Sequence, residues 1–121
     1  MKKTFRSEAD VKAAVKDCLK AMHAWYFMPS SNGYGRAGIP DIVGVLNGVP
    51  FAAELKFAKN KPTPAQKCEL AAITRSGGVA MLINETNLDV LADIMSDVEL
   101  GLLPRAKALA VATLKEYGVE V

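Results

Sequence analysis

The chain has 121 residues, a length that suits one domain with a modest core. Half of the residues are apolar and 23% are charged, and no apolar run reaches the length of a membrane-spanning helix. The formal net charge of +2 is too small to indicate a nucleic-acid partner by itself. The opening Met-Lys-Lys leads into charged sequence, which predicts no secretory signal and a cytoplasmic protein. Cys18 and Cys68 lack metal-ligand spacing, which predicts reduced packing residues in helices.

The first predicted element is a helix over residues 8–22. Ser7 has the side chain of a good N-cap, and Asp10 follows three residues later as an acidic variant of the capping box. Apolar residues then recur at helical spacing: Val11, Ala14, Val15, Cys18, Leu19 and Met22. A strand is predicted over residues 25–28, and a flexible loop rich in Ser, Asn and Gly follows over residues 30–38.

The next two predicted strands form a hairpin. Asn47-Gly48 is the strongest two-residue hairpin signal, because both residues tolerate the positive φ of a type I′ turn. The flanking segments 41–46 and 49–57 have the composition of strands. Counting back from a two-residue loop places Asp41 opposite Glu54, with both side chains on one face and Cα atoms roughly 4.5 Å apart.

Two carboxylates and an ammonium group thus gather on one face of the hairpin. Glu54 and Lys56 share that face because strand side chains alternate. Asp41 and Glu54 would repel each other unless a cation were bound between them. Together with the Leu55 carbonyl they offer oxygen ligands suited to Mg²⁺ or Mn²⁺. The alternative is a surface hairpin with a cross-strand charge pair. The opposite face is predicted to be apolar core: Phe51, Ala53, Leu55 and Phe57.

These residues resemble a known nuclease family. Gly38-Ile39-Pro40-Asp41, the glycine-containing hairpin, Glu54-Leu55-Lys56 and the later Gln66 resemble the PD-(D/E)XK nuclease superfamily. The closest match is the virus-type replication-repair nuclease (VRR-NUC) family, small versions of which occur in phages. The resemblance covers roughly residues 8–85.

The resemblance implies a restriction-endonuclease-like α/β fold and a Mg²⁺- or Mn²⁺-dependent endonuclease that hydrolyses DNA phosphodiester bonds. It further implies a homodimer acting on branched DNA, such as four-way (Holliday) junctions, in a bacterial or phage-infected cell. The alternative is a non-catalytic DNA-binding or assembly module that retains a nuclease fold. A sequence-specific restriction enzyme is disfavoured, because nothing obvious remains for a separate base-reading domain.

Lys56 and Gln66 complete the predicted catalytic set. Lys56 would stabilise the attacking hydroxide or the charge developing on the phosphate. The resemblance makes Gln66 an active-site residue near the metal or the scissile phosphate, and this is the interpretation we favour. Thr63, Pro64 and Gln66 also fit the N-cap, N1 and N3 positions of a helix, so a capping box would explain Gln66 without chemistry.

Glu8 is the third predicted carboxylate of the site. It precedes Val11 by three residues and so lies on the apolar stripe of the first helix. The resembling family has a glutamate in this place, which implies that Glu8 points toward Asp41 and Glu54 and holds a metal ion or orients water. The alternative is a first-turn glutamate that complements the helix dipole and pairs with Lys12.

Four cationic residues are candidates for contacts with DNA: Arg36, Lys59, Lys61 and Lys67. The three lysines follow the second hairpin strand closely, which predicts a surface that tracks phosphates beside the site. A solvated lysine-rich loop is the alternative for Lys59 and Lys61. Arg36 stands alone in its loop, and no nucleotide-binding glycine pattern accompanies it.

The rest of the chain predicts a helix from Thr63 to the glycines at 77–78, a strand over residues 79–83 and two more helices. The whole is a single nuclease domain over residues 1–121, with a core of about 8–85 and a C-terminal helical extension of about 86–121. The fold class is α/β, with a small mixed sheet flanked by helices. One apolar stripe in the last helix is a candidate dimer surface, with intramolecular packing as its alternative: Ala106, Leu109, Ala110 and Leu114.

Overall fold

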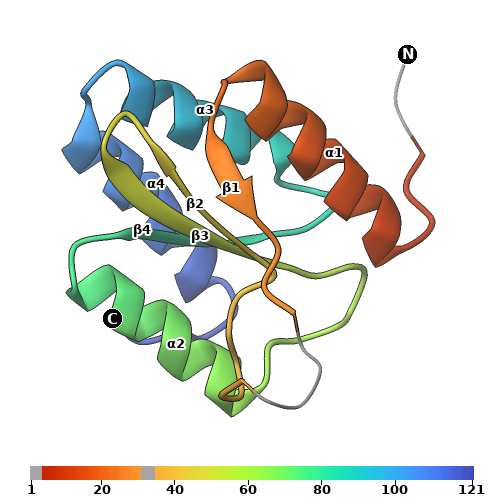
Figure 1. Ribbon diagram of the computed structural model, residues 1–121. Coiled ribbons are helices and arrows are strands. Elements are labelled where there is room, and N and C mark those ends of the chain that lie inside the picture. Colours follow the sequence, from red (N-terminus) through yellow and green to blue (C-terminus); the bar gives the residue numbers. More distant parts are fainter. Residues whose placement is uncertain (1–3, 31–34) are drawn as a thin grey trace.

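The computed structural model describes residues 4–30 and 35–121, and within them eight elements form a sheet with helices on both faces (Figure 1). In chain order these are α1 (Glu8–Ala21), β1 (Trp25–Phe27), β2 (Ile42–Leu46), β3 (Val49–Leu55), α2 (Pro64–Arg75), β4 (Val79–Ile83), α3 (Leu88–Glu99) and α4 (Leu103–Lys115). The strand order is β1-β2-β3-β4, antiparallel except for the parallel pair β3–β4. The predicted small mixed sheet is confirmed. Part of the predicted loop over 30–38 lies outside the described residues.

The predicted hairpin register is confirmed. Asn47 and Gly48 both have positive φ, at 50° and 76°, as a type I′ turn requires. Pairing runs from Leu46 opposite Val49 back to Ile42 opposite Ala53. β2 starts one residue later than predicted and β3 stops two residues earlier, at Leu55. The side-chain amide of Asn47 donates to the carbonyls of Val98 and Glu99 at 3.2 Å, which ties the turn to the end of α3.

The larger hydrophobic core lies between one face of the sheet and helices α1 and α3, and we call this side the α1/α3 face (Figure 1). The helical spacing found in the sequence is what places Val11, Val15 and Leu19 there. β3 contributes Phe51, Ala53 and Leu55, as predicted. The remaining contributions come from α3 (Leu91, Ile94, Met95 and Val98), from α4 (Ala106 and Ala110) and from the inward side chains of β2 and β4 (Ile42, Leu46, Val79, Met81 and Ile83).

The opposite side of the sheet, the α2 face, carries a second and smaller core. Leu70 and Ala71 of α2 belong to it, together with Ala80 and Leu82 of β4. β3 is therefore covered on both sides, and its outward residues Ala52 and Glu54 are only 2% and 1% exposed. The face of β3 that was predicted to carry the carboxylate chemistry is therefore itself largely buried, because α2 packs on that side of the sheet.

Helix α4 covers the edge of β4. Thr113 makes the link: its Oγ1 accepts a hydrogen bond from the Leu82 N–H at 3.0 Å and donates one to the Ala110 carbonyl at 2.7 Å. A sheet edge sealed in this way is unavailable for strand pairing. The predicted dimer stripe is buried inside the molecule at Ala106, Ala110 and Leu114, so it is not a free surface and the packing alternative is correct.

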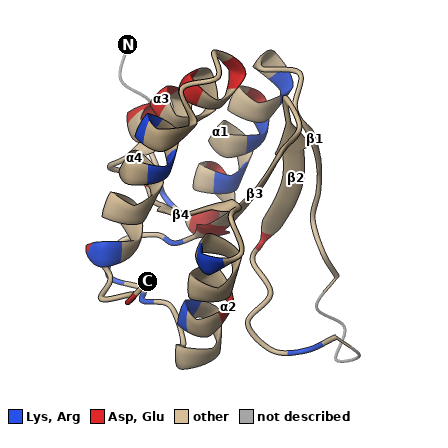
Figure 2. Cartoon of the chain, turned by 90° about the vertical axis from the view of Figure 1, so that its left-hand side faces the viewer, with Lys and Arg blue, Asp and Glu red and all other residues tan. Residues whose placement is uncertain are grey.

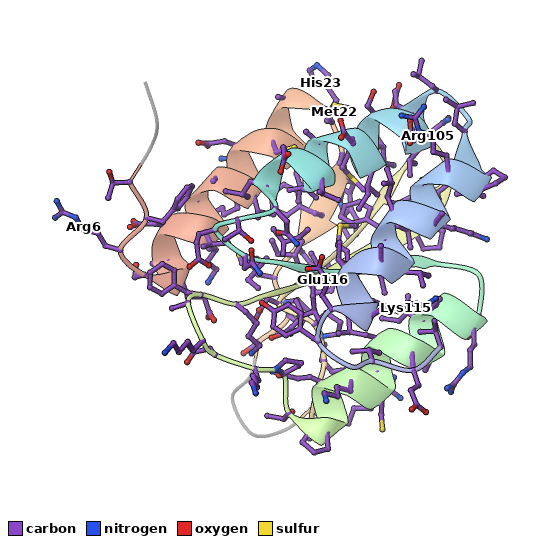
Figure 3. The ribbon with its side chains drawn as sticks, turned by 180° about the vertical axis from the view of Figure 1, so that it is seen from behind. Arg6, Met22, His23, Arg105, Lys115 and Glu116 are labelled. Atoms are coloured by element: carbon purple, nitrogen blue, oxygen red, sulfur yellow. The ribbon has the colours of Figure 1, made fainter. Side chains whose placement is uncertain are left out.

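The ends of α4 are anchored to its neighbours. Arg105, near its start, lies beside α3, and its Nε is 3.3 Å from Asp97 Oδ2 (Figure 3). Lys115 and Glu116 mark the other end, next to α2 (Figure 3). No helix within the described ranges is long and apolar enough to cross a membrane. Both cysteines are free, but only Cys18 packs against a core, whereas Cys68 is exposed on α2 and is not the packing residue predicted.

Candidate active site

The structure brings Asp41, Glu54 and Lys56 together at one end of the sheet. Asp41 directly precedes β2, and its Oδ2 accepts a hydrogen bond from the Leu55 N–H at 2.8 Å. Lys56 follows β3 directly, and its Nζ lies 3.1 Å from Glu54 Oε2. The hairpin register that the turn imposes thus continues through Asp41. The backbone N–H of Lys56 is held by the Ile83 carbonyl at 3.0 Å, so β4 supports the same end of β3.

Glu54 is a buried carboxylate with an unfilled hydrogen-bonding position. Its Oε1 is buried and has no hydrogen-bond partner. Burial and, to a lesser extent, the negative charge of Asp41 raise the pKa of Glu54 to about 7, against the opposing effect of Lys56. A buried acceptor without a partner is costly in a folded protein. The side chain is therefore suited to exchange its proton for a cation near neutral pH.

The donor set fits a divalent metal ion. A pair of adjacent carboxylates, one with an orphaned oxygen, matches the use of one or two protein carboxylates by Mg²⁺, with waters and phosphate filling the remaining positions. No thiolate or imidazole stands in the pair. Among the described residues no three acidic, cysteine or histidine side chains come close enough to hold a metal together. The candidate metal ligands are Asp41, Glu54 and the Leu55 carbonyl.

Glu8 does not join this pair. It forms the first residue of α1 and is exposed, although its spacing places it in line with Val15. Glu8 forms no three-carboxylate metal group with Asp41 and Glu54 among the residues that the structure describes, so a role for it in the site stays a prediction. Asp10 shows how that turn is stabilised: its N–H donates to Ser7 Oγ, and its carboxylate accepts from the Arg6 N–H.

Gly38 holds the segment before Asp41 against the start of α2. Its φ is +86°, and a Cβ placed there would lie 2.4 Å from the backbone of Ala65 and 2.8 Å from Gln66 N. Only glycine combines this backbone conformation with so close an approach. A cavity of about 600 Å³ lies at this contact and is lined by residues 29–30 and 35–41 and by Gln66. Asp41 and Gln66 therefore open onto the same space.

Gln66 forms the predicted capping box. Its Oε1 accepts from the Thr63 N–H at 2.9 Å, and Thr63 Oγ1 accepts from the Gln66 N–H at 3.1 Å. The cap engages only the amide oxygen, so the Nε2 group remains a donor at the cavity. The two interpretations of Gln66 are thus compatible, whereas the sequence alone suggested that one residue could not easily serve both.

The predicted DNA-contacting cations divide into two groups on either side of the start of α2. Arg36 pairs with Glu69, with Nη2 and Nε at 2.8 and 3.1 Å from Oε2. Lys59, Lys61 and Lys67 surround a separate hollow of about 520 Å³, which Tyr117 also lines. Figure 2 marks basic residues on α2 and the loops around it as well as on other helices. Arg36 is thus engaged within the protein, while the lysine group faces a space large enough for a partner.

Two structural contributors to the site were missed in the sequence. Gly38 was noted only as part of a motif, and its contact with α2 needed the fold. The carboxylate of Glu85 accepts from the Ala58 N–H at 2.9 and 3.1 Å, and so holds the turn that follows Lys56. The signal for Glu85 was available: β3 and β4 are parallel, so residues after their ends meet at one edge of the sheet.

The order of elements, the mixed sheet and the position of the carboxylate pair define a restriction-endonuclease-like α/β fold. Among solved structures, one described as a VRR_NUC domain matches with a TM-score of 0.62 and 24% sequence identity, over 73% of this chain and 97% of that chain. This likeness confirms the fold that the resemblance of the motifs implied. No family model and no curated protein matches the sequence.

Proposed function

We propose that this protein is a metal-dependent DNA endonuclease. The observation that carries the proposal is the buried Glu54 beside the half-buried Asp41, with one Glu54 oxygen unpartnered and Lys56 at 3.1 Å from the other. Further support comes from the fold likeness to a VRR_NUC domain, which is a nuclease family by name. A protein without catalytic activity would have no reason to bury Glu54 next to a second carboxylate, Asp41, which lines a cavity.

The chain's own residues take distinct parts in phosphodiester hydrolysis. A Mg²⁺ or Mn²⁺ ion held by Asp41, Glu54 and the Leu55 carbonyl would supply Lewis acidity and lower the pKa of water. Asp41 is fixed for this task by its hydrogen bond from the Leu55 N–H. Lys56 is oriented by Glu54 and carries positive charge to the phosphate. Gln66 lines the cavity where the phosphate would lie, and its amide nitrogen, which the cap does not use, would donate to it.

The proposed substrate is branched DNA, and the proposed assembly is a two-fold homodimer. One small site cuts one strand at a time, and symmetric resolution of a four-way junction needs two sites. The lysine hollow at Lys59, Lys61 and Lys67 supplies positive charge beside α2 for a duplex arm. The dimer surface must lie elsewhere than the buried stripe of α4.

The test is cleavage of end-labelled linear, flap and four-way DNA with Mg²⁺, Mn²⁺ or chelator, by the wild type and by Asp41→Asn and Glu54→Gln. Asp89→Asn, an exposed carboxylate at the start of α3, is the matched control. We expect cation-dependent cleavage by the wild type and the control only. DNA binding without any cleavage would support the non-catalytic module instead.

A further inference from the structure

An exposed aromatic surface lies on the same face of the sheet as the carboxylate pair. Trp25 and Phe27 of β1 are 62% and 48% exposed, and Val45 beside them is 42% exposed. The two rings pack against each other, with centroids 5.6 Å apart and planes tilted by 53°. Large apolar side chains that remain in solvent together mark binding sites more often than isolated ones do. We call Trp25, Phe27 and Val45 the aromatic platform.

Strand alternation fixes which way the aromatic platform faces. Tyr26 packs against the core on the α1/α3 face, so Trp25 and Phe27 point to the opposite, α2 face. Trp25 pairs with Val45 in the register, and Phe27 pairs with Val43. Helix α2 covers β3 and β4 on this side, and Figure 2 shows no helix over the outer side of β1 and β2. The platform is therefore the uncovered half of the face that carries Glu54.

The aromatic platform is continuous with the candidate active site. Along β2, side chains on this face alternate from Val45 to Val43 and then to Asp41, each step being roughly 7 Å. Phe27, opposite Val43, thus stands one such step from the Asp41 position, roughly the span of two stacked bases. No charged residue lies in 24–28 or 42–46, and both strands are uncharged along their length in Figure 2. An apolar surface on β1 and β2 therefore extends as far as the carboxylates.

We infer that the aromatic platform stacks an unpaired base of the DNA substrate next to the scissile phosphate. This inference rests on the proposed function and names a feature of its substrate, namely an unstacked nucleotide beside the cut. Aromatic faces bind bases of any sequence, and single-stranded DNA is commonly held by such rings beside a basic groove. Trp25 and Phe27 act as positioning residues: they hold the strand whose phosphate Asp41, Glu54 and Lys56 face.

A second copy of the chain fits the platform less well. Each aromatic side chain offers roughly 200 Å², and about half of that is exposed, so the platform is far below the roughly 800 Å² per partner of a standard interface. The three residues of β1 also provide too short an edge for extensive strand pairing. Its area suits one or two bases, and its position makes any occupant a neighbour of the cleaved strand.

The experiment uses Trp25 as its own probe, because it is the only tryptophan of the chain. The full-length protein is titrated with a short oligodeoxythymidine in chelator, while tryptophan emission and the anisotropy of a labelled oligonucleotide are followed. We expect binding to quench Trp25. Trp25→Ala and Phe27→Ala should each weaken single-strand binding by roughly tenfold, and Trp25→Phe should retain most of the affinity. Leu100→Ala removes a similarly exposed apolar side chain, 69% exposed after α3, and should change nothing.

Each other outcome overturns the inference. If the oligonucleotide binds but tryptophan emission does not change, the bases bind elsewhere on the protein. If the oligonucleotide does not bind at all, single-stranded DNA is not a ligand of the aromatic platform. Sedimentation of the same variants completes the test: if Trp25→Ala or Phe27→Ala converts a dimer into a monomer, the occupant is a second copy. Cleavage distinguishes this inference from the proposed function. Quenching of Trp25 without metal-dependent cleavage would support base binding at the aromatic platform and reject the nuclease function. Metal-dependent cleavage that the Trp25→Ala and Phe27→Ala variants retain in full would support the nuclease function and reject the role of the platform.

Discussion

The two faces of the sheet differ in what their side chains do. The α1/α3 face is apolar and closed, and almost every residue on it packs into one core. The α2 face contains a small core, a carboxylate pair of which Glu54 is buried, a cavity and an exposed aromatic pair. The closed face supplies the folding free energy that allows the other face to bury Glu54 and to leave Trp25 exposed, both of which are unfavourable without a ligand.

The largest expected effect is on DNA cleavage, and it distinguishes substitutions on the α2 face from those on the α1/α3 face. Asp41→Asn, Glu54→Gln and Lys56→Met should each reduce metal-dependent DNA cleavage by about 1000-fold or more, because each removes a charge at the reacting phosphate. Ile94→Val on the α1/α3 face should cost about 1 kcal/mol of stability and leave cleavage unchanged. Cleavage rates and circular dichroism of all four variants measure this. A folded Asp41→Asn with wild-type activity would remove Asp41 from the mechanism.

A second prediction concerns how tightly the cavity is built. Gly38→Ala should destabilise the protein by about 3 kcal/mol, because the new Cβ meets the Ala65 backbone and φ is positive. Gly48→Ala is a matched control, with a similar φ of +76° but open space around its Cβ, and should cost only about 1 kcal/mol. Urea denaturation compares the two variants. Equal losses would show that the contact with α2 contributes nothing.

The pH dependence of stability should reveal the burial of Glu54. Its pKa lies near 7 in the folded protein and at an ordinary 4.5 when exposed, so between these values the folded state binds a proton that the unfolded state has lost. Without metal, the free energy of unfolding should therefore fall as pH rises from 4.5 to 7, by on the order of 2 kcal/mol from this group. Glu54→Gln should lack this component, and Asp89→Asn should keep it. Parallel pH profiles for the wild type and Glu54→Gln would contradict a raised pKa.

The smallest expected change in stability tests the double role of Gln66. Gln66→Glu keeps an acceptor for the Thr63 N–H, so the free energy of unfolding should change by less than about 0.5 kcal/mol. It replaces the free amide donor at the cavity with a negative charge, so cleavage should fall by roughly 100-fold. Thr63→Ala breaks the cap from the other side and should cost about 1 kcal/mol while largely sparing activity. Full activity of Gln66→Glu would reduce Gln66 to a helix cap.

Much of the fold was predictable from sequence because local rules determined it. The Asn47-Gly48 turn fixed the register that brings Asp41 beside Glu54, and helical spacing located all four helices to within a few residues. Long-range packing was harder to predict. The burial of Ala52 beneath α2 and of the α4 stripe against β4 depends on where helices dock, which no local pattern states. The exposure of Glu8 also depends on how α1 docks: its spacing placed it in line with Val15, but no local pattern states how much of the first turn is covered.

The most direct test of the central claim is a Mn²⁺ titration of thermal stability at pH 8, where Glu54 must be ionised. Mn²⁺ should raise the melting temperature of the wild type. When the free Mn²⁺ concentration is a hundred times the dissociation constant, the increase should be equivalent to about 3 kcal/mol of stability. Glu54→Gln and Asp41→Asn should show little of this increase, and Asp89→Asn should show all of it. An equal increase in every variant, or none in the wild type, would contradict a metal site built on Asp41 and Glu54.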